Sequence, residues 1–373
     1  MSRDIMRVCT SAATVDAPRL ARWFPVPSLV APRAAGVDIS DTSIKWIEFV
    51  PKGKGLVVHT YGSVQIKPGV VIEGIVRDEV VLAEALKELQ KKVGGTPYLH
   101  AALPEEAAYV FTVHTPEVRD RAQTRAIIEF EFEARVPLAL ENAVYDYDVV
   151  DMHPDGVGAE IAVVVFARDI VEGYERAFAR AGLALQSLEI EARSIARALV
   201  PQASEAVTLV VDFGRARSGI AVVSGRVPMF TSTVEVGGDL MTRVIMEKID
   251  VDTVGAEKIK NDQGIVGEDS RVTEAVVNTA AALADEVTRH FQYWDSRHTE
   301  HGAKVTPITQ VLLVGGSSNL KGLPEYVAER VHARVLRGNP WINCCTFDAY
   351  IPPIHRHHAL GYATAIGLAL RGI

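Results

Sequence analysis

The sequence predicts an α/β protein built from two similar lobes. Two apolar strands, one ending in Asp38 and one in Asp212, are each followed by a short polar turn and a second apolar strand. The two aspartates lie 174 residues apart (212 minus 38), too far for a solenoid repeat and close to the size of one lobe. Strands and helices alternate after each hairpin, as in α/β domains. Two matching lobes predict a cleft between them.

The composition narrows the classes of function. A chain of 373 residues exceeds the length at which one core stops growing, so at least two domains are expected. Its 48% hydrophobic and 23% charged residues are typical of a globular protein. A formal charge of −8 argues against nucleic acid, which normally requires a basic face. Cys9, Cys344 and Cys345 have neither disulfide nor zinc spacing and favour a reducing cytoplasm.

The first half of the chain divides into a strand-rich core and a small module. Apolar runs at 36–50 and 56–66 read as strands, and a helix at about 79–93 ends at two glycines. The strands YLHAALP and AYVFTVHT complete this core. Residues 116–190 read as a separate α/β module of helix, strand, strand and helix. Residues 1–33 are expected to be a loosely ordered leader.

The second half repeats the α/β order. After the hairpin that begins at 207, the strand PMFTSTVEVGG leads to a helix from Asp239, and a second helical piece follows at 256–262. A long helix at about 270–295, the strand TQVLLVGG and a helix with Pro324 in its first turn complete the lobe. The final run ALGYATAIGLALRGI is too short for the roughly 20 residues that span a bilayer. It is therefore expected to be a buried helix, without direct membrane insertion.

The two Asp hairpins predict a phosphate-binding site. A tight turn between strands presents backbone N–H groups, and such a concavity attracts phosphate. An aspartate beside phosphates would act through a metal ion or its water, and Mg²⁺ is the natural bridge. Each hairpin alone also fits an ordinary turn with Asp as a turn residue. The order of hairpin, hairpin, strand into Gly-Gly and small-residue helix favours the phosphate site, since GxxxxGK[ST] and GxGxxG are both missing.

Five segments in this order resemble the signature segments of the actin-like ATPases, and among them the PilM proteins of type IV pilus assembly, which are similar to FtsA. These segments are GVDISDTSIKWIEFV, EARSIARAL, LVVDFGRARSGIAVVSGRVPMFTSTVEVGGDLMT, VLLVGGSSNLKGLPEYVAERV and YATAIGLALRG. IIEFEFEARVPLALENAVYDYDVV resembles the helix and strand of the small inserted subdomain of PilM. The resemblance covers about 34–373.

The resemblance implies an actin-like fold of two lobes, each with a mixed β-sheet and helices, and a small α/β subdomain inserted in the first lobe. It implies ATP and Mg²⁺ in the cleft. It also implies a partner: the N-terminal cytoplasmic tail of a PilN-like inner-membrane protein, held between the first and inserted subdomains, with other pilus platform proteins and homo-oligomers left open. The protein would be cytoplasmic, peripheral to the inner membrane through that partner. The implied domains are a leader at 1–33, the first lobe at 34–115 and 191–206, the insertion at 116–190, the second lobe at 207–345, and a C-terminal segment at 346–373 that packs on the first lobe.

The resemblance also assigns site residues by position. The first phosphate segment comprises Asp38, Ser40, Thr42, Ser43 and Lys45, and the second comprises Asp212, Gly214, Arg215, Arg217 and Ser218. The nucleoside segments comprise Gly237, Gly238, Glu257, Lys258 and Lys260, and the adenosine segment comprises Gly315, Gly316 and Ser317. Asp38 and Asp212 would hold Mg²⁺ through water, and Glu191 would orient the attacking water.

Three positions depart from the family pattern. Ser40 stands where the family usually has glycine, and a Cβ restricts both backbone approach and positive φ. Arg215 and Arg217 stand where small or hydroxyl residues are common. They either grip phosphates through charge-assisted hydrogen bonds or fill an empty cleft, so ATP binding is expected while its hydrolysis is left open.

Several other features have simpler interpretations. His355, His357 and His358 form a metal-ligand pattern, but histidines on a Pro-rich loop are more often exposed. Glu129, Glu131 and Glu133 are spaced i, i+2 on a helix and face different ways, which favours a solvated face over an acid/base pair. Glu191 is also a favourable acid at a helix start.

Three alternative functions remain beside pilus assembly. A small-molecule kinase of the same fold would need an Asp over a substrate hydroxyl in a recognisable motif, which we do not find. An FtsA-type division protein would usually end in an amphipathic membrane helix. Type II secretion would use the same kind of scaffold in another machine.

Overall fold

The computed structural model describes residues 33–53, 55–115, 121–150, 159–298 and 304–371. It divides into two compact units: unit 1 comprises Met1–Arg197, Cys344–Pro353 and Thr364–Ile373, and unit 2 comprises Ala198–Asn343 and Ile354–Ala363. The predicted leader, except Arg33, lies outside the described residues. Each unit contains one mixed five-stranded sheet, which confirms the α/β prediction with two related sheets.

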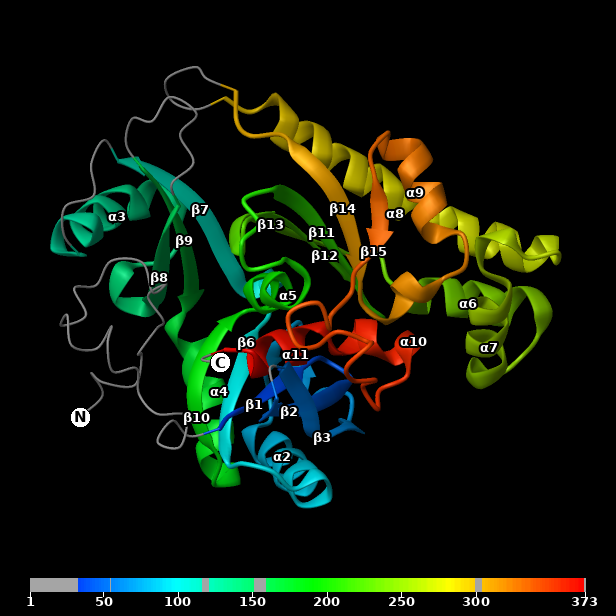
Figure 1. Ribbon diagram of the computed structural model, residues 1–373, viewed down its shortest axis with the longest axis horizontal. Helices are drawn as coiled ribbons and strands as arrows, with labels where there is room; N and C mark the ends of the chain where they lie inside the picture. Colours follow the sequence, from blue (N-terminus) through cyan, green and yellow to red (C-terminus); the bar gives the residue numbers. More distant parts are fainter. Residues whose placement is uncertain (1–32, 54, 116–120, 151–158, 299–303, 372–373) are drawn as a thin grey trace. The chain divides into compact units, whose positions relative to one another are not determined.

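The main sheet of unit 1 has the strand order β10-β6-β1-β2-β3 (Figure 1). The strands are β1 Ala35–Ile39, β2 Ser43–Lys52, β3 Gly55–Gln65, β6 Tyr98–Leu103 and β10 Ala184–Ile190. β1, β2 and β3 pair antiparallel, whereas β1, β6 and β10 pair parallel. Every residue of β1 is buried, as expected of a central strand whose two faces are both covered.

Helices cover both faces of this sheet. Leu82 and Leu86 of α2 (Glu79–Val93) and Phe178 of α4 (Arg168–Ala181) bury against one face, each contributing about 1.5–3 kcal/mol. Asp78 caps α2 by accepting the N–H groups of its first turn. On the other face, Gly36 lets α11 (Ala363–Ala369) approach: a Cβ there would lie 2.6 Å from Ala369 N. α5 (Glu191–Leu199) follows β10, and β4 (Val71–Ile72) and β5 (Ile75–Val76) form a small hairpin.

A separate three-stranded sheet of unit 1 has the order β7-β9-β8, all antiparallel. Its strands are β7 Ala108–Thr115, β8 Ala143–Val150 and β9 Ala159–Ala167, and α3 (Arg121–Arg135) packs on it through Ile128 and Phe132. The short 3₁₀ turns η1 (Glu105–Ala107) and η2 (Leu140–Asn142) precede β7 and β8.

This small sheet coincides only in part with the expected insertion at 116–190. β7, expected in the first lobe core, pairs with β9 of the small sheet, while β10 pairs with β6 of the main sheet. α4 packs mainly with α2, although it also contacts β8 and β9 of the small sheet. The reason is that hydrogen bonds between strands select partners far apart in sequence, which local patterns do not encode. The C-terminal segment likewise divides, because 354–363 belongs to unit 2. The subdomain boundaries themselves stay a prediction.

The sheet of unit 2 has the strand order β13-β12-β11-β14-β15 (Figure 1). Its strands are β11 Val207–Phe213, β12 Ser218–Ser224, β13 Val227–Val234, β14 Ile308–Val314 and β15 Val335–Arg337. The helices are α6 Gly238–Ile249, α7 Thr253–Gln263, α8 Ser270–Ser296, α9 Leu323–Val331 and α10 Arg356–Ala359, with 3₁₀ turns η3 Gly264–Val266, η4 Gly316–Asn319 and η5 Leu360–Tyr362. α8 matches the predicted long helix to within a residue, and Pro324 lies in the first turn of α9 as predicted.

The terminal apolar run forms η5 and the short helix α11, whose residues are buried, as expected. In the part of the chain that the structure describes, every helix is too short or too polar to span a bilayer.

Candidate functional site

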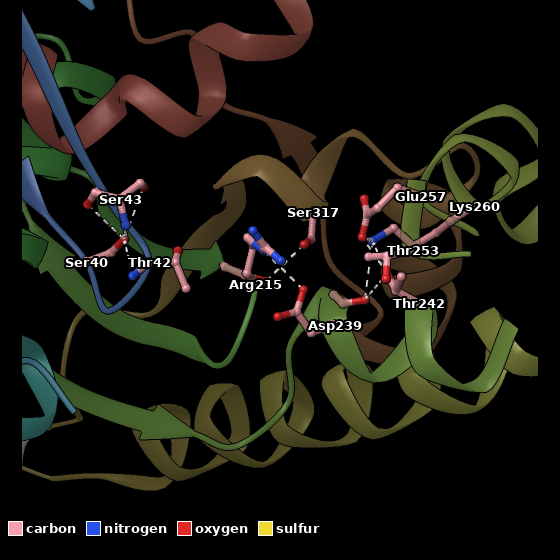
Figure 2. A network of polar contacts seen from close by, with 12 residues as sticks. Ser40, Thr42, Ser43, Arg215, Asp239, Thr242, Thr253, Glu257, Lys260 and Ser317 are labelled. Carbon is pink, nitrogen blue, oxygen red and sulfur yellow. Dashed lines mark hydrogen bonds and ion pairs between the residues drawn. The ribbon is translucent and has the colours of Figure 1, made fainter. Parts of the chain in front are cut away.

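The turn between β1 and β2 in unit 1 is closed by a serine side chain. Ser40 N donates to Ser43 O at 2.9 Å, and Ser40 Oγ accepts the N–H of Ser43 at 3.1 Å (Figure 2). Ser40 does not adopt a positive φ, since the described non-glycine residues that do are Glu73, Asp250 and His332. The Cβ of Ser40 therefore meets no positive-φ restriction in this turn, and the hydroxyl holds the backbone in place.

Asp38 and Lys45 are cross-strand neighbours at the base of this turn. They face each other in the β1–β2 register, and Lys45 Nζ lies 3.2 Å from Asp38 Oδ2. Asp38 is 7% exposed, so the ammonium offsets the cost of burying its carboxylate. The two predicted residues thus form an ion pair at the base of the turn.

Asp41 is a turn residue that the sequence did not single out. Its carboxylate accepts the N–H groups of Glu73 at 3.2 Å and Gly74 at 3.0 Å, which ties the β4–β5 hairpin to the β1–β2 turn. Both of these residues have positive φ. Because the partners are 32 and 33 residues away, no local pattern could have indicated this role.

In unit 2, the turn between β11 and β12 follows Asp212. Gly214 N donates to Arg217 O at 3.1 Å, which closes the turn, and Ser218 Oγ donates to Val236 O at 2.5 Å. Asp212 is half-buried and pairs across the sheet with Val314, the last residue of β14. The strand ends that carry Asp212 and the Gly315-Gly316 pair therefore lie side by side.

Glycines allow three segments to meet at the start of α6. Gly238 N donates to Gly214 O at 3.1 Å, and Ser317 Oγ donates to the same carbonyl at 2.9 Å. A Cβ on Gly238 would come within 3.0 Å of Ser317 Oγ, and one on Gly315, whose φ is 87°, would lie 2.6 Å from Phe213 O. Gly237, Gly238 and Gly315 are thus required for this close approach.

Gly316 differs from its neighbour Gly315. No atom lies within 4 Å of the position of a Cβ on Gly316, so its surroundings are open. An exposed backbone between strand end and 3₁₀ turn is a surface that a ligand can approach closely.

A buried lysine organises the region between α6 and α7. Lys260 is 5% exposed, and its Nζ donates to Thr242 Oγ1 at 2.9 Å, Glu257 Oε1 at 2.7 Å and Gly238 O at 3.3 Å (Figure 2). Burial opposes ionisation of Glu257, but the hydrogen bonds from Lys260 and Thr242 outweigh it and lower the pKa of that carboxyl. The result is a satisfied ammonium and carboxylate directly behind the glycine that begins α6.

Arg215 has a protein partner that the sequence did not indicate. Its Nε lies 3.1 Å from Asp239 Oδ1 in the first turn of α6, and its side chain is 56% exposed (Figure 2). An exposed pair of this kind contributes little to stability, so Arg215 is available to an anionic ligand at small cost. Arg217 is half-buried.

The remaining candidates are dispersed. Lys258 is exposed, whereas Lys260, two residues further along α7, is buried. Glu191 is the first residue of α5, and its carbonyl accepts Ser194 Oγ at 2.7 Å. Residues 38–45 and Glu191 belong to unit 1 and the other site residues to unit 2, so a crevice shared by Asp38 and Asp212 stays a prediction.

The two weaker sequence patterns also have simple outcomes. His355 stacks on His357 with ring centroids 5.2 Å apart, but within the described ranges no group of three or more His, Cys, Asp or Glu is arranged to hold a metal ion. Glu129 and Glu131 pair with Arg125 and Arg135, one turn away on α3.

A cavity in unit 1 lies between the main and small sheets. It is lined by residues of β6, β8, β9 and β10, among them Leu103, Val144, Val164 and Leu188. Its volume is ≈ 60 Å³, well below the roughly 150 Å³ that takes a benzene ring, so it suits an aliphatic side chain.

Buried ion pairs surround this cavity. Asp148 of β8, 5% exposed, accepts two bonds from the Arg193 guanidinium of α5, one of them at 2.8 Å. Glu189 pairs with Arg197 at 2.8 Å and with Arg371 at 3.1 Å. These ion pairs hold the β-strands that form the walls of the cavity. Breaking one of them would leave a buried charge without a partner, which is costly.

Comparison with known families decides the identity. The model of the type IV pilus assembly protein PilM family matches residues 36–373, almost the whole described chain. The chain belongs to the PilM family. Of the functions considered from the sequence, this selects type IV pilus assembly over a kinase, cell division or type II secretion.

Solved structures confirm the actin-like fold. The chain is similar to a PilM-PilN type IV pilus biogenesis complex, with 22% identity and a TM-score of 0.74 over 91% of this chain and 98% of that one. It is also similar to the ethanolamine utilization protein EutJ from Carboxydothermus hydrogenoformans, at 20% identity and a TM-score of 0.54 over 92% and 90% of the two chains. MreB 5 of Spiroplasma citri, solved with AMPPNP, has 10% identity and a TM-score of 0.52 over 90% and 95%. A nucleotide is thus bound by a protein of the same fold.

Proposed function

We propose that this PilM-family protein is a cytoplasmic ATP-binding scaffold of the type IV pilus inner-membrane platform. The observation that carries the proposal is the junction at Gly214 O, where the N–H of Gly238 and the hydroxyl of Ser317 meet. It brings the predicted phosphate, nucleoside and adenosine segments of unit 2 to one place. The fold alone does not supply this, since it depends on glycine at 237, 238 and 315.

The residues of this junction fit a nucleotide. Gly316 leaves open backbone for the base or ribose, and Glu257, held charged by Lys260, offers a carboxylate oxygen to hydroxyl groups. Arg215 and Arg217 would hold phosphate oxygens through charge-assisted hydrogen bonds. The β1–β2 turn, with Ser40, Thr42, Ser43 and Lys45, would bind the phosphates from the other lobe.

Magnesium would join the two halves of this site. Asp212 and Asp38 offer carboxylates, the ligand type that Mg²⁺ prefers, and would act through its water molecules. Bound Mg²⁺ would offset part of the negative charge of the triphosphate. Glu191 would orient water if ATP is hydrolysed. ATP would favour a closed arrangement of the lobes only if it bound that arrangement more tightly than an open one.

Calorimetry with the variant Asp212→Ala tests nucleotide binding. We expect the affinity for ATP with Mg²⁺ to fall by at least about tenfold, because the metal loses an anionic partner. Asp348→Ala is the control, since Asp348 is an exposed residue of unit 1 that belongs to neither turn. Equal ATP affinity of Asp212→Ala and the wild type would reject the assignment.

We further propose that the partner is the N-terminal tail of a PilN-like membrane protein, with an aliphatic side chain in the cavity between the two sheets of unit 1. The apolar wall of Leu103, Val144, Val164 and Leu188 supports this, as does the similarity of the chain to a PilM solved in complex with PilN. Attachment to the inner membrane would then be indirect, through this partner.

Two variants on one strand test the partner site. Val144→Trp would fill the cavity, whereas Val149→Trp changes a residue of β8 that is 45% exposed. We expect a synthetic PilN-like tail peptide to bind the wild type and Val149→Trp with equal affinity. Its affinity for Val144→Trp should be lower by about tenfold or more. Undiminished binding to Val144→Trp, or amide protection by the peptide outside β6 to β10, would refute the location.

A further inference from the structure

A second pocket of unit 1 lies beside the middle of β2 and the start of β6. It has a volume of ≈ 370 Å³, within the range of small-molecule sites, and most of its lining is polar. It is lined by Arg33, Glu48, His59, Gly95, Thr96 and Tyr98. Neither the nucleotide nor the partner tail proposed above uses any of these residues.

The innermost charge of this pocket is a buried carboxylate. Glu48 of β2 is 2% exposed, and its Oε2 accepts the N–H of Thr96 at 3.1 Å. Across the described chain, no Lys, Arg or His nitrogen lies within 4.0 Å of a Glu48 oxygen. A buried carboxylate with a single amide donor is costly, and a cation supplied by a ligand would offset that cost.

A β-bulge presents a histidine beside this carboxylate. In the β2–β3 ladder Glu48 pairs with Thr60, but the next residue, Phe49, pairs with Val58, so His59 is the extra residue of the bulge. Bulges redirect side chains and recur next to binding sites. His59 is exposed and lines the pocket, although it would otherwise continue a regular strand.

The chain beyond α2 is also shaped around Glu48. Gly94 and Gly95 both have positive φ, 68° and 87°, and a Cβ on Gly95 would lie 2.5 Å from Glu48 Oε2. Thr60 Oγ1 donates to Val93 O at 2.5 Å, which fixes the end of α2 to the same strand. Two glycine-only positions, a bulge and a buried charge therefore coincide at one pocket, and such conflicts with local preference are expected at binding sites.

We propose that this pocket binds a small zwitterion with the chemistry of a free α-amino acid. The ammonium group pairs with Glu48 on the floor, and the carboxylate faces Arg33, whose planar guanidinium suits a carboxylate, and His59. Tyr98, 39% exposed, offers its ring to the ligand's side chain. The order of charges, negative inside and positive at the rim, sets the orientation of the ligand. The proposal does not depend on nucleotide or partner binding.

The test uses the full-length protein and calorimetric titration with the twenty amino acids, each up to about 10 mM, a range suited to weak millimolar to micromolar ligands. Matched probes are an alkyl amine without the carboxylate and a fatty acid without the amine. We expect at least one amino acid to bind, and both matched probes to bind about tenfold more weakly or worse, because each leaves one charge of the pocket unpaired.

Three variants locate the binding. Glu48→Gln keeps an oxygen for Thr96 N while removing the charge, and Arg33→Gln changes an exposed residue outside the sheets, so it cannot act through the core. Each variant should weaken binding of the amino acid by about tenfold, the usual cost of losing a charged partner. Lys52→Gln, exposed at the end of β2, is the control and should bind normally.

Three results would overturn the proposal: no amino acid binds, an amine without a carboxylate binds equally well, or both Glu48→Gln and Arg33→Gln bind as the wild type does. Should Glu48→Gln fail to fold, Arg33→Gln and the matched probes still decide the question. Loss of thermal stability in Arg33→Gln without any amino-acid binding would instead indicate an internal Arg33–Glu48 ion pair in solution, which also refutes the proposal.

Discussion

Two adjacent glycines provide a sharp test of the junction in unit 2. Gly315→Ala places a Cβ in a backbone with φ of 87°, which costs about 1–2 kcal/mol for a residue other than glycine. The same Cβ lies 2.6 Å from Phe213 O and within 3.0 Å of Asp212 Oδ1, so β11 or β14 has to shift, at a further cost of about 1–3 kcal/mol. We therefore expect a loss of about 2–5 kcal/mol in the stability of unit 2.

Gly316→Ala is the matched control, one residue away. No atom lies within 4 Å of its Cβ position, and its φ is not positive. Alanine there is expected to change stability by less than about 1 kcal/mol, in either direction, since it mainly restricts the unfolded chain.

Amide hydrogen exchange of β11 and β14 measures the local stability, and urea unfolding measures the whole chain. Local exchange is the better readout because a protein of two units need not unfold in one step. We expect the wild type and Gly316→Ala to have similar local stability and Gly315→Ala to be clearly less stable. If the two alanine variants differ by less than about 0.5 kcal/mol, the close packing of Gly315 on Asp212 is wrong.

Three further predictions concern charged residues. Lys260→Met should weaken ATP binding by about tenfold or more, because Glu257 and Gly238 O lose their hydrogen-bond partner. The control Lys258→Met should bind ATP normally. Equal effects of the two variants in a fluorescent-nucleotide titration would contradict the proposed site. Arg193→Met should destabilise unit 1 by about 3–5 kcal/mol in urea unfolding, since Asp148 is left buried without a cation. The control Arg176→Met breaks an exposed pair with Glu79 and should cost less than about 1 kcal/mol. Similar losses of stability in the two variants would contradict the argument from burial. Burial, with Arg371 nearby, lowers the pKa of His100 to about 4 from 6.5, so the folded protein binds this proton less readily than the unfolded chain and should lose up to about 3 kcal/mol as the pH falls from 6.5 to 4. His100→Gln should lose less over that range than the exposed-site control His298→Gln, and parallel pH profiles in urea unfolding would show that His100 is not the group responsible.

The positions of the turns, helices and strands were predicted from local patterns, and these predictions are confirmed where the feature itself is local. The Asp hairpins, the long helix α8 and the glycines that end strands all lie where the sequence placed them. Ser40 shows what the family pattern does not give: a serine stands where the family usually has glycine, and its hydroxyl closes the turn without a positive φ. The backbone of a turn can be held by a hydrogen bond from a side chain, and it does not always require glycine.

Partners across the fold were not predictable in the same way. Thr242 lies one helical turn from Gly238, and Lys260 lies three residues from Glu257, so each half of the polar cluster has a local signal. Nothing in the sequence indicates that the two halves meet, or that Asp239 would pair with Arg215. The same holds for Glu48, which reads as an ordinary strand residue until the bulge at His59 and the glycines after α2 surround it.

The sequence by itself determined the two-lobed α/β class, the spans of most helices and strands, and the family to which the chain belongs. These follow from hydrophobic periodicity, glycine conformations and motif order, which act over a few residues at a time. The tertiary structure alone decided that β7 joins β9 and β10 joins β6, which lysine of α7 is buried, and which carboxylates have a cation. The physical reason is that interstrand hydrogen bonds and the cost of burying charge depend on groups brought together from distant parts of the chain, and only the folded protein brings them together.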